Sequence, residues 1–146
     1  MGQSMKVHFR LFQDEDGYPP ATVESIWAQP TTKAGEYVLD NVPFFAREAT
    51  IGDIVAVREE DGHLWFERLV HRSQNSLVRV VFFDRTAVER VNRQLSALEC
   101  STEYIEAHNL LAVNIPNTVD LRDVQGYLQS EASAGTLDYE EPILRQ

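Results

Sequence analysis

The side chains best suited to chemistry in this chain are its histidines and its one cysteine. His8, His63, His71 and His108 are far apart, and none has another His or Cys three to five residues away. Structural zinc sites use such local pairs, so we expect no metal site and interpret the histidines as surface or hydrogen-bonded groups. Cys100 follows a predicted helix, whose negative end raises the pKa of a thiol, so we expect a packing residue.

An acidic loop offers a second candidate for chemistry. Asp14, Asp16 and Gly17 resemble the start of a calcium-binding loop, because alternate carboxylates can point at one cation. The glycine comes too early, however, and Ser25 stands where such a loop needs a bidentate acid. We therefore expect a solvated turn. Gly-x-Ser-x-Gly, Walker-type and Gly-x-Gly-x-x-Gly motifs are absent, so the sequence indicates no catalytic residue and no cofactor, and it leans away from an enzyme.

A third candidate is the predicted loop over residues 40–52, which contains Asn41, Pro43, Phe44 and Phe45. Two adjacent aromatic side chains cannot both point the same way from extended backbone. In one interpretation, Pro43 and Phe44 tuck the loop under a barrel. In the other, Asn41 and Phe45 form a binding surface beside acidic neighbours. The sequence leaves both interpretations open.

The charge of the chain narrows the range of partners. Lys and Arg number 13 against 23 Asp and Glu, which gives a net charge of -10. Such a charge repels phosphates and anionic lipids at long range, so we expect a basic protein partner, no nucleic acid and no membrane. A single cysteine and the lack of a signal peptide or apolar span favour the cytoplasm. Residues 1–4 are expected to be a leader without a structural role.

The first half of the chain has the pattern of short strands. Apolar and polar residues alternate over residues 6–12, and further strands are predicted at residues 22–28, 36–39, 54–57 and 64–70. Asp61-Gly62 supplies the positive φ angles of a hairpin turn between the last two. We therefore predict a small bent β-sheet or partly open barrel over residues 5–73.

The second half adds helices. The strands predicted at residues 77–83, 102–106, 110–115 and 137–141 alternate with two amphipathic helices. Thr86 and Glu89 suggest a capping box for the first helix, and Asn117-Thr118 a cap for the second, with Asp120 and Asp123 near its positive end. The order β-α-β-β-α-β predicts a ferredoxin-like unit over residues 74–146, and an α+β fold overall.

A ferredoxin-like unit with Phe82 and Phe83 on a strand also suggests RNA recognition. The strand at residues 110–115 lacks the aromatics that such a module uses, and basic residues do not cluster around the predicted sheet. Together with the acidic charge, these observations argue against that function.

Several short motifs resemble those of a bacterial family of unknown function. The motifs are Asp14-x-Asp16-Gly17-x-Pro19, Glu24-x-x-Trp27-Ala28, Tyr37-x-Leu39-Asp40-Asn41-x-Pro43-Phe44-Phe45-Ala46 and Gly52-Asp53-x-Val55. The resemblance runs from residue 6 to residue 141 and is carried mainly by the Asn-x-Pro-Phe and Gly-Asp signatures. It implies no established activity and no catalytic residues. Small acidic bacterial proteins of this kind are often inhibitors of a neighbouring toxin, which is an analogy.

Three functions follow as hypotheses. The first is a non-enzymatic protein-binding module, in its most concrete form an immunity protein that covers a toxin's active site with an acidic surface. Its expected partner-binding residues are Asp14, Asp16, Asp40, Asn41, Phe45, Glu59, Glu60 and Asp61. The second is a small-molecule sensor or enzyme with a pocket between the two subdomains, using Glu24, Asp40, His71 or Glu103. The third is a homo-oligomeric scaffold joined by edge strands.

Overall fold

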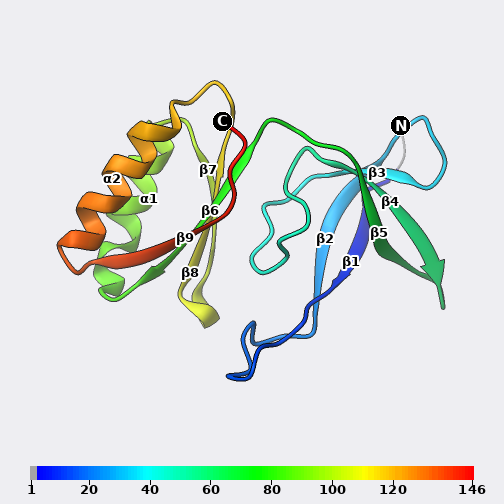
Figure 1. Ribbon diagram of the computed structural model, residues 1–146, viewed down its shortest axis with the longest axis horizontal. Helices are drawn as coiled ribbons and strands as arrows, with labels where there is room; N and C mark the ends of the chain where they lie inside the picture. The colour runs from blue at the N-terminus through cyan, green and yellow to red at the C-terminus, as the bar shows by residue number, and fades with distance from the viewer. Residues whose placement is uncertain (1–2) are drawn as a thin grey trace. The chain divides into compact units, whose positions relative to one another are not determined.

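The chain forms two compact units, residues 1–73 and residues 74–146, in an α+β fold (Figure 1). The computed structural model describes residues 3–146, so Met1 and Gly2 of the expected leader lie outside the described residues. Among the described residues, no helix combines the length and apolar character needed to cross a membrane.

The first unit is a closed barrel of five strands. The strands are β1 (Met5–Arg10), β2 (Val23–Pro30), β3 (Glu36–Leu39), β4 (Ile54–Glu60) and β5 (His63–His71). Consecutive strands pair antiparallel, and β1 also pairs in parallel with β5, with Val7 opposite Leu64 and His8 opposite Trp65. The barrel is therefore closed, where the sequence predicted a bent sheet or partly open barrel. Its closing pair joins strands that are far apart in the chain.

Alternation along the strands fills the barrel. Val7 and Phe9 on β1 face inward with Ile26 on β2, and the rings of Phe9 and Phe66 stack with centroids 4.6 Å apart. Two register shifts between β4 and β5 add local bending, which helps five strands close on themselves. The predicted hairpin turn is confirmed, since Asp61 and Gly62 have φ angles of 54° and 79°.

A carboxylate holds the loop between β3 and β4 against the barrel. The Glu24 side chain accepts hydrogen bonds from the backbone N–H groups of Phe44 at 2.6 Å, Phe45 at 3.0 Å and Ala46 at 2.8 Å. We call this set the Glu24 clasp. Successive N–H groups that converge on one carboxylate form a strong, charge-assisted contact. The clasp places Ala46 in the barrel core.

The same loop is fixed at both of its ends. Asn41 Oδ1 accepts a hydrogen bond from the N–H of Trp27 at 2.8 Å. Asp53 is fully buried and accepts from the N–H of Thr50 at 2.9 Å and of Ser73 at 2.8 Å. Residues 41–53 are thus secured by side chains from three positions, which compensates for their lack of regular backbone pairing.

The substitution Glu24→Gln tests the clasp. The amide keeps the size of the side chain but replaces one acceptor oxygen with an NH₂ donor that faces backbone N–H groups. We expect the free energy of unfolding of the first unit to fall by about 2–4 kcal/mol, because charge-assisted hydrogen bonds are lost and partly buried donors are left unpaired. Urea denaturation followed by tryptophan fluorescence measures this, since Trp27 and Trp65 are the chain's two tryptophans.

Glu15→Gln is the matched control, because Glu15 is exposed on the β1–β2 loop. It should change the free energy of unfolding by less than about 0.5 kcal/mol. Equal effects of the two substitutions would contradict the role of the clasp.

The second unit is a four-stranded antiparallel sheet with two α-helices. Its strands are β6 (Ser76–Phe82), β7 (Ser101–Ile105), β8 (Leu110–Ile115) and β9 (Leu137–Ile143), in the order β7-β8-β6-β9. Helices α1 (Val88–Ala97) and α2 (Leu121–Ser133) cover one face of the sheet (Figure 1). Short 3₁₀ turns lie at Arg85–Ala87 and Glu106–His108. The core joins β6 to both helices through Val80, Leu95 and Leu128.

The helices begin differently from the prediction. Asp84 accepts a hydrogen bond from the N–H of Thr86 at 3.0 Å and starts a 3₁₀ turn, so Thr86 and Glu89 do not form a capping box. Ala87 is then the N-cap of α1 and provides no side-chain cap. At α2 the cap is Asp120, which accepts from the N–H of Arg122 at 2.9 Å, in place of Asn117-Thr118. In both cases an aspartate next to the helical turn supplies the charged acceptor.

A charged cluster ties α1 to α2. Glu131 on α2 accepts hydrogen bonds from Arg90 on α1 and from the Tyr127 hydroxyl, the latter at 2.9 Å. Arg90 lowers the pKa of Glu131 through its hydrogen bond, with further lowering by Tyr127 and Thr136, against the opposing effect of burial. The charged form of Glu131 is therefore stabilised by folding.

The pH dependence of stability should report this cluster. Because folding lowers the pKa of Glu131, its stabilisation is complete above the unfolded value of about 4.3 and is lost as the pH falls through the lower folded value. The stability difference between the wild type and Glu131→Gln should be largest at neutral pH and should shrink toward pH 3. Urea denaturation followed by circular dichroism at each pH measures it, with the exposed Glu99→Gln as control. A difference independent of pH would exclude this linkage.

Candidate functional site

Two acidic groups among the predicted partner-binding residues stand at loop tips of the barrel. Asp14 shapes the β1–β2 loop, because its Oδ1 accepts from the N–H of Asp16 at 2.9 Å and of Tyr18 at 3.0 Å. Asp16 is exposed in that loop. Among the described residues, no group of three or more His, Cys, Asp or Glu side chains is arranged to hold a metal ion.

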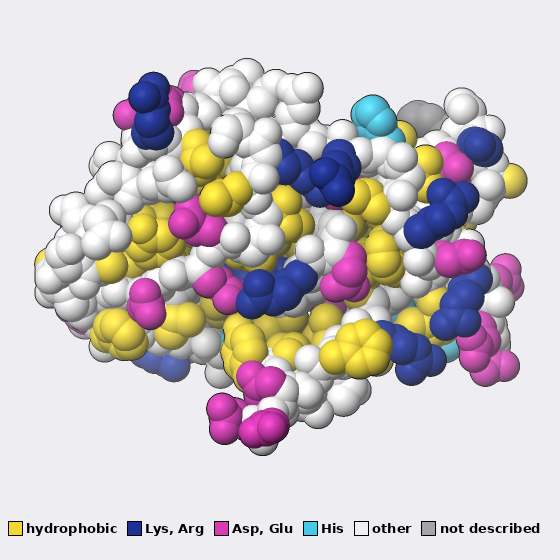
Figure 2. Space-filling view, viewed as in Figure 1, with side chains coloured by type: hydrophobic (Ala, Val, Ile, Leu, Met, Phe, Trp, Pro, Cys, Tyr) yellow, Lys and Arg dark blue, Asp and Glu magenta, His cyan; other side chains and the backbone are white. Residues whose placement is uncertain are grey.

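The second acidic group is the tip of the β4–β5 hairpin. Glu59, Glu60 and Asp61 are all exposed. Glu60 forms an ion pair with Arg58 at 2.8 Å, and Asp61 occupies the left-handed position of the turn. Figure 2 shows acidic side chains gathered over the β1–β2 loop and over this hairpin tip, and Figure 1 shows that the two tips lie apart. The predicted residues thus form two acidic tips, and no single continuous site.

The remaining predicted binding residues belong mainly to the loop at residues 41–53. The amide oxygen of Asn41 holds Trp27, as described above. Phe45 is half-buried against the barrel core, and its ring meets that of Tyr18 edge-on at 6.2 Å. Asp40 is exposed, with Gln29 Nε2 3.5 Å from its carboxylate. Among the side chains of these three residues, the Asp40 carboxylate is the most exposed polar group.

The four residues considered as acid or base groups of a catalytic pocket lie in different parts of the two units. Glu24 is occupied by the clasp. Asp40 and His71 are exposed in the first unit, and His71 ends β5. Glu103 lies on β7 of the second unit. None of these four residues lines either of the two cavities described below.

The structure also reveals a basic and aromatic surface that sequence reasoning missed. Lys6, His8 and Arg10 point outward from β1, since Val7 and Phe9 between them are buried. On one side, the β1–β2 register places Lys6 opposite Trp27 and His8 opposite Ser25. On the other side, the parallel pairing with β5 places Trp65 next to His8. We call this surface the β1 face.

The side chains of the β1 face contact one another. Lys6 Nζ lies 5.0 Å from the centroid of the Trp27 ring, and the Arg10 guanidinium lies 4.6 Å from that of Trp65. The His8 ring lies 5.4 Å from Trp65 and 5.2 Å from His63. These are cation–π and aromatic contacts that orient large side chains at the surface.

His8 is the titratable centre of this face. Its Nδ1 lies 2.6 Å from Ser25 Oγ. Partial burial lowers the pKa of His8, and the Coulombic interactions with His63 and Lys6 lower it further. His8 is therefore neutral at pH 7, and Lys6 and Arg10 carry the positive charge of the row.

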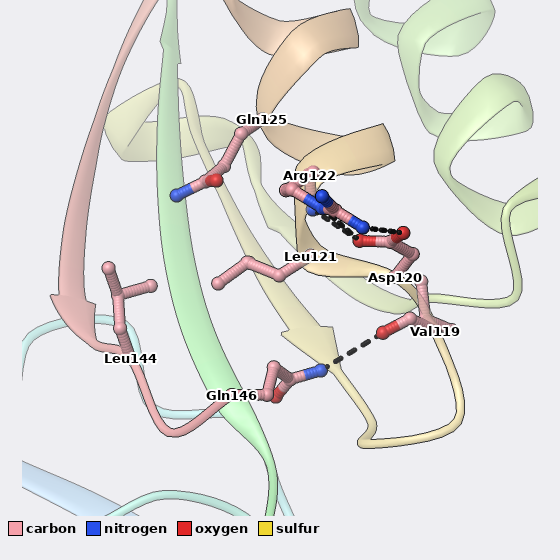
Figure 3. A pocket seen from close by; sticks show the side chains of 7 residues that line it. All are labelled: Val119, Asp120, Leu121, Arg122, Gln125, Leu144 and Gln146. Carbon is pink, nitrogen blue, oxygen red and sulfur yellow. Dashed lines mark hydrogen bonds and ion pairs between the residues drawn. The ribbon is translucent and has the colours of Figure 1, made fainter.

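Each unit has a small cavity of its own. In the first unit a cavity of about 160 Å³ begins at Arg10 and is lined by Leu11, Phe12, Pro19, Phe45, Arg47 and Glu48. In the second, a cavity of about 450 Å³ lies beside the start of α2 (Figure 3). There, Asp120 and Arg122 form an ion pair and Gln146 donates to the carbonyl of Val119 at 3.1 Å, so these polar groups bond to one another.

Cys100 is a packing residue, as predicted, but for another physical reason. It is buried in the core of the second unit, and burial raises the pKa of its thiol to about 11. The sequence had attributed the raised pKa to the end of the helix. A thiol with this pKa is a poor nucleophile at neutral pH.

Alkylation should detect this burial. With a pKa of about 11, roughly 0.1% of the thiol is ionised at pH 8, against a substantial fraction in an unfolded chain. We expect iodoacetamide to label Cys100 roughly 100-fold more slowly in the native protein than in urea. Mass spectrometry of timed samples measures both rates. Similar rates would show that the thiol is accessible and ionised in the folded state.

The fold and these surfaces define an α+β protein with a closed barrel, acidic loop tips and a basic, aromatic strand face. Residues 24–139 match the family described as a domain of unknown function, DUF4265, and the chain belongs to this family. This match confirms the expectation that the chain belongs to a family of unknown function.

A solved structure shares the fold of the whole chain. It is described as a novel crystal structure of a hypothetical protein from Neisseria gonorrhoeae, and it superposes with a TM-score of 0.82 at 23% identity, covering 100% of this chain and 99% of that chain. The likeness establishes a common fold. No curated protein sequence matches the chain.

Proposed function

We propose that this protein is a non-enzymatic protein-binding module whose acidic loop tips contact a basic protein. The carrying observation is the exposed β4–β5 hairpin tip, where Glu59 and Asp61 stand on a tight turn between paired strands. Such a turn holds charges in place at low entropic cost. The net charge of -10 adds a long-range attraction to a basic partner.

The most concrete form of this proposal is an immunity protein. Its acidic groups would cover the basic active-site cleft of a cognate toxin in the cytoplasm. Complementary charge gives fast association that slows as salt rises, because salt screens exposed charges. The second acidic tip, at Asp14–Asp16, would provide another contact with the same partner.

We further propose that residues 5–73 and 74–146 act as two subdomains and that the second has the ferredoxin-like arrangement. Its element order, β6-α1-β7-β8-α2-β9, and its sheet order, β7-β8-β6-β9, support this assignment. The helices on one face of the sheet give it the layered form of an α+β unit.

Affinity capture from the native host tests the binding function. We expect the tagged protein to retain one stoichiometric basic protein at 50 mM salt and to release it at 500 mM. The double variant Glu59→Gln, Asp61→Asn should bind this protein at least about threefold more slowly in surface plasmon resonance, because steering charge is lost.

The matched control carries Glu99→Gln and Glu106→Gln, two exposed acids of the second unit. It changes the net charge by the same amount and should leave the association rate within about twofold of the wild type. A capture without any stoichiometric protein at low salt overturns the proposal and favours the rival function, a small-molecule sensor or enzyme with a pocket between the subdomains. Self-association alone would favour the homo-oligomeric scaffold.

A further inference from the structure

The β1 face carries an evenly spaced row of nitrogen-bearing side chains. Lys6, His8 and Arg10 occupy alternate positions of one strand and point to the same side. Alternate residues of a strand lie about 6.8 Å apart. The row is therefore a line of two fixed positive charges with a histidine between them, suited to an extended anionic chain rather than to a single small anion.

Both tryptophans of the chain flank this row. Trp27 on β2 is 45% exposed, and Trp65 on β5 is half-buried. Lys6 and Arg10 lie over their rings, so cation and aromatic surface are presented together. A guanidinium plane that rests on an indole ring is itself a platform on which a flat base can stack.

We propose that the β1 face, made of Lys6, His8, Arg10, Trp27 and Trp65, binds single-stranded nucleic acid. The cations neutralise phosphates along the strand, and the indole rings and the Arg10 plane stack on unpaired bases. A duplex hides its base faces and gains only the phosphate contacts. An acidic peptide gains the charge contacts but leaves the aromatic surface without a stacking partner.

The net charge of -10 does not prevent this binding at physiological salt. Exposed charges interact weakly beyond the Debye length, which is about 8 Å at 0.15 M, so the charges of the face itself decide. Glu60 lies across from His63 and is already paired with Arg58 at 2.8 Å. Glu67 is a second exposed acid on β5. Asp40, whose N–H donates to the Trp27 carbonyl at 2.8 Å, is a third exposed acid beside the face. These three acids match Lys6, Arg10 and Arg58 in number, so the contact depends on the two cations that lie over the tryptophan rings.

This inference is independent of the protein-binding function, because it uses the strand face rather than the acidic loop tips. Loss of one activity by substitution should leave the other intact. The acidic double variant Glu59→Gln, Asp61→Asn should therefore retain oligonucleotide binding, which separates a failure of this inference from a failure of the proposed function.

Intrinsic fluorescence of the full chain provides the first test. Both tryptophans lie on the β1 face, so a bound base should quench emission without any substitution. We expect quenching by a 12-nucleotide oligothymidine at pH 6.5 and 100 mM salt, and weaker quenching by a duplex of equal length. Anisotropy of the fluorescein-labelled oligonucleotide gives the affinity and its salt dependence.

Substitutions then locate the site. Lys6→Gln with Arg10→Gln should weaken binding at least tenfold and reduce the slope of log affinity against log salt by about 1.4, since two phosphate contacts are lost. Lys33→Gln with Arg72→Gln removes the same charge from exposed positions elsewhere on the first unit and should stay within about twofold. Trp27→Ala should weaken binding roughly 5- to 100-fold through lost stacking.

Several outcomes would overturn the inference. The first is that oligonucleotide at up to about 1 mM does not quench the wild type. The others are equal losses of binding in the two charge variants, or equal binding of single strand and duplex. Tighter binding of polyglutamate than of oligothymidine would assign the face to an acidic protein. If the mass in solution doubles as the protein concentration rises, and tryptophan emission is quenched without oligonucleotide, the β1 face would be assigned to contact with a second copy of the chain.

Discussion

The first unit depends on the Glu24 clasp. The loop between β3 and β4 contains little regular structure, yet Ala46 and Ala49 from it are fully buried in the barrel core. Backbone groups carried to such a position need hydrogen-bond partners, and one carboxylate provides them for three consecutive N–H groups. Glu24 can do this because it lies two residues before the buried Ile26, so both side chains point to the inward side of β2. Asn41 and Asp53 hold the two ends of the same segment, so the barrel core is completed by polar contacts as much as by apolar packing.

This arrangement gives the sequence signatures a structural meaning. Glu24, Asn41, Ala46 and Asp53 all belong to the motifs that resemble a family of unknown function, and each takes part in holding the loop at residues 41–53. The sequence left open whether this loop is tucked under the barrel or forms a binding surface. The buried alanines and the hydrogen bond that the Trp27 N–H donates to Asn41 Oδ1 favour the first interpretation for most of the loop. A motif of this kind identifies a fold, and its residues carry little direct information about a ligand.

Local sequence patterns predicted most helices and strands, whereas features that depend on long-range contacts were not predicted. Alternating residues and the Asp61-Gly62 turn located the strands of the barrel, because both signals lie within a few neighbouring residues. The parallel pairing of β1 with β5 joins residues more than fifty positions apart and has no local signal, so closure was missed. The same limit applies to the histidines. Sequence spacing separated His8 from His63, yet barrel closure brings their rings to 5.2 Å. The predicted helix caps were wrong for a local reason. Several nearby side chains can accept a hydrogen bond from the same turn, and Asp84 does so in place of Thr86.

Net charge is a sum, and this fold shows why a sum is a poor guide to surfaces. Exposed acids of the first unit gather at two loop tips, where the chain turns and polar residues are favoured. The strand β1, whose outward positions are Lys6, His8 and Arg10, lies between β2 and β5 and is flanked by tryptophans from both. Closure of the barrel thus creates a basic, aromatic face on an acidic protein. At physiological salt the screening length is about 8 Å, so a partner in contact with this unit interacts mainly with the charges next to the point of contact. A distant partner therefore interacts with the net negative charge of the whole protein, whereas a bound partner interacts with the charges of the surface that it contacts.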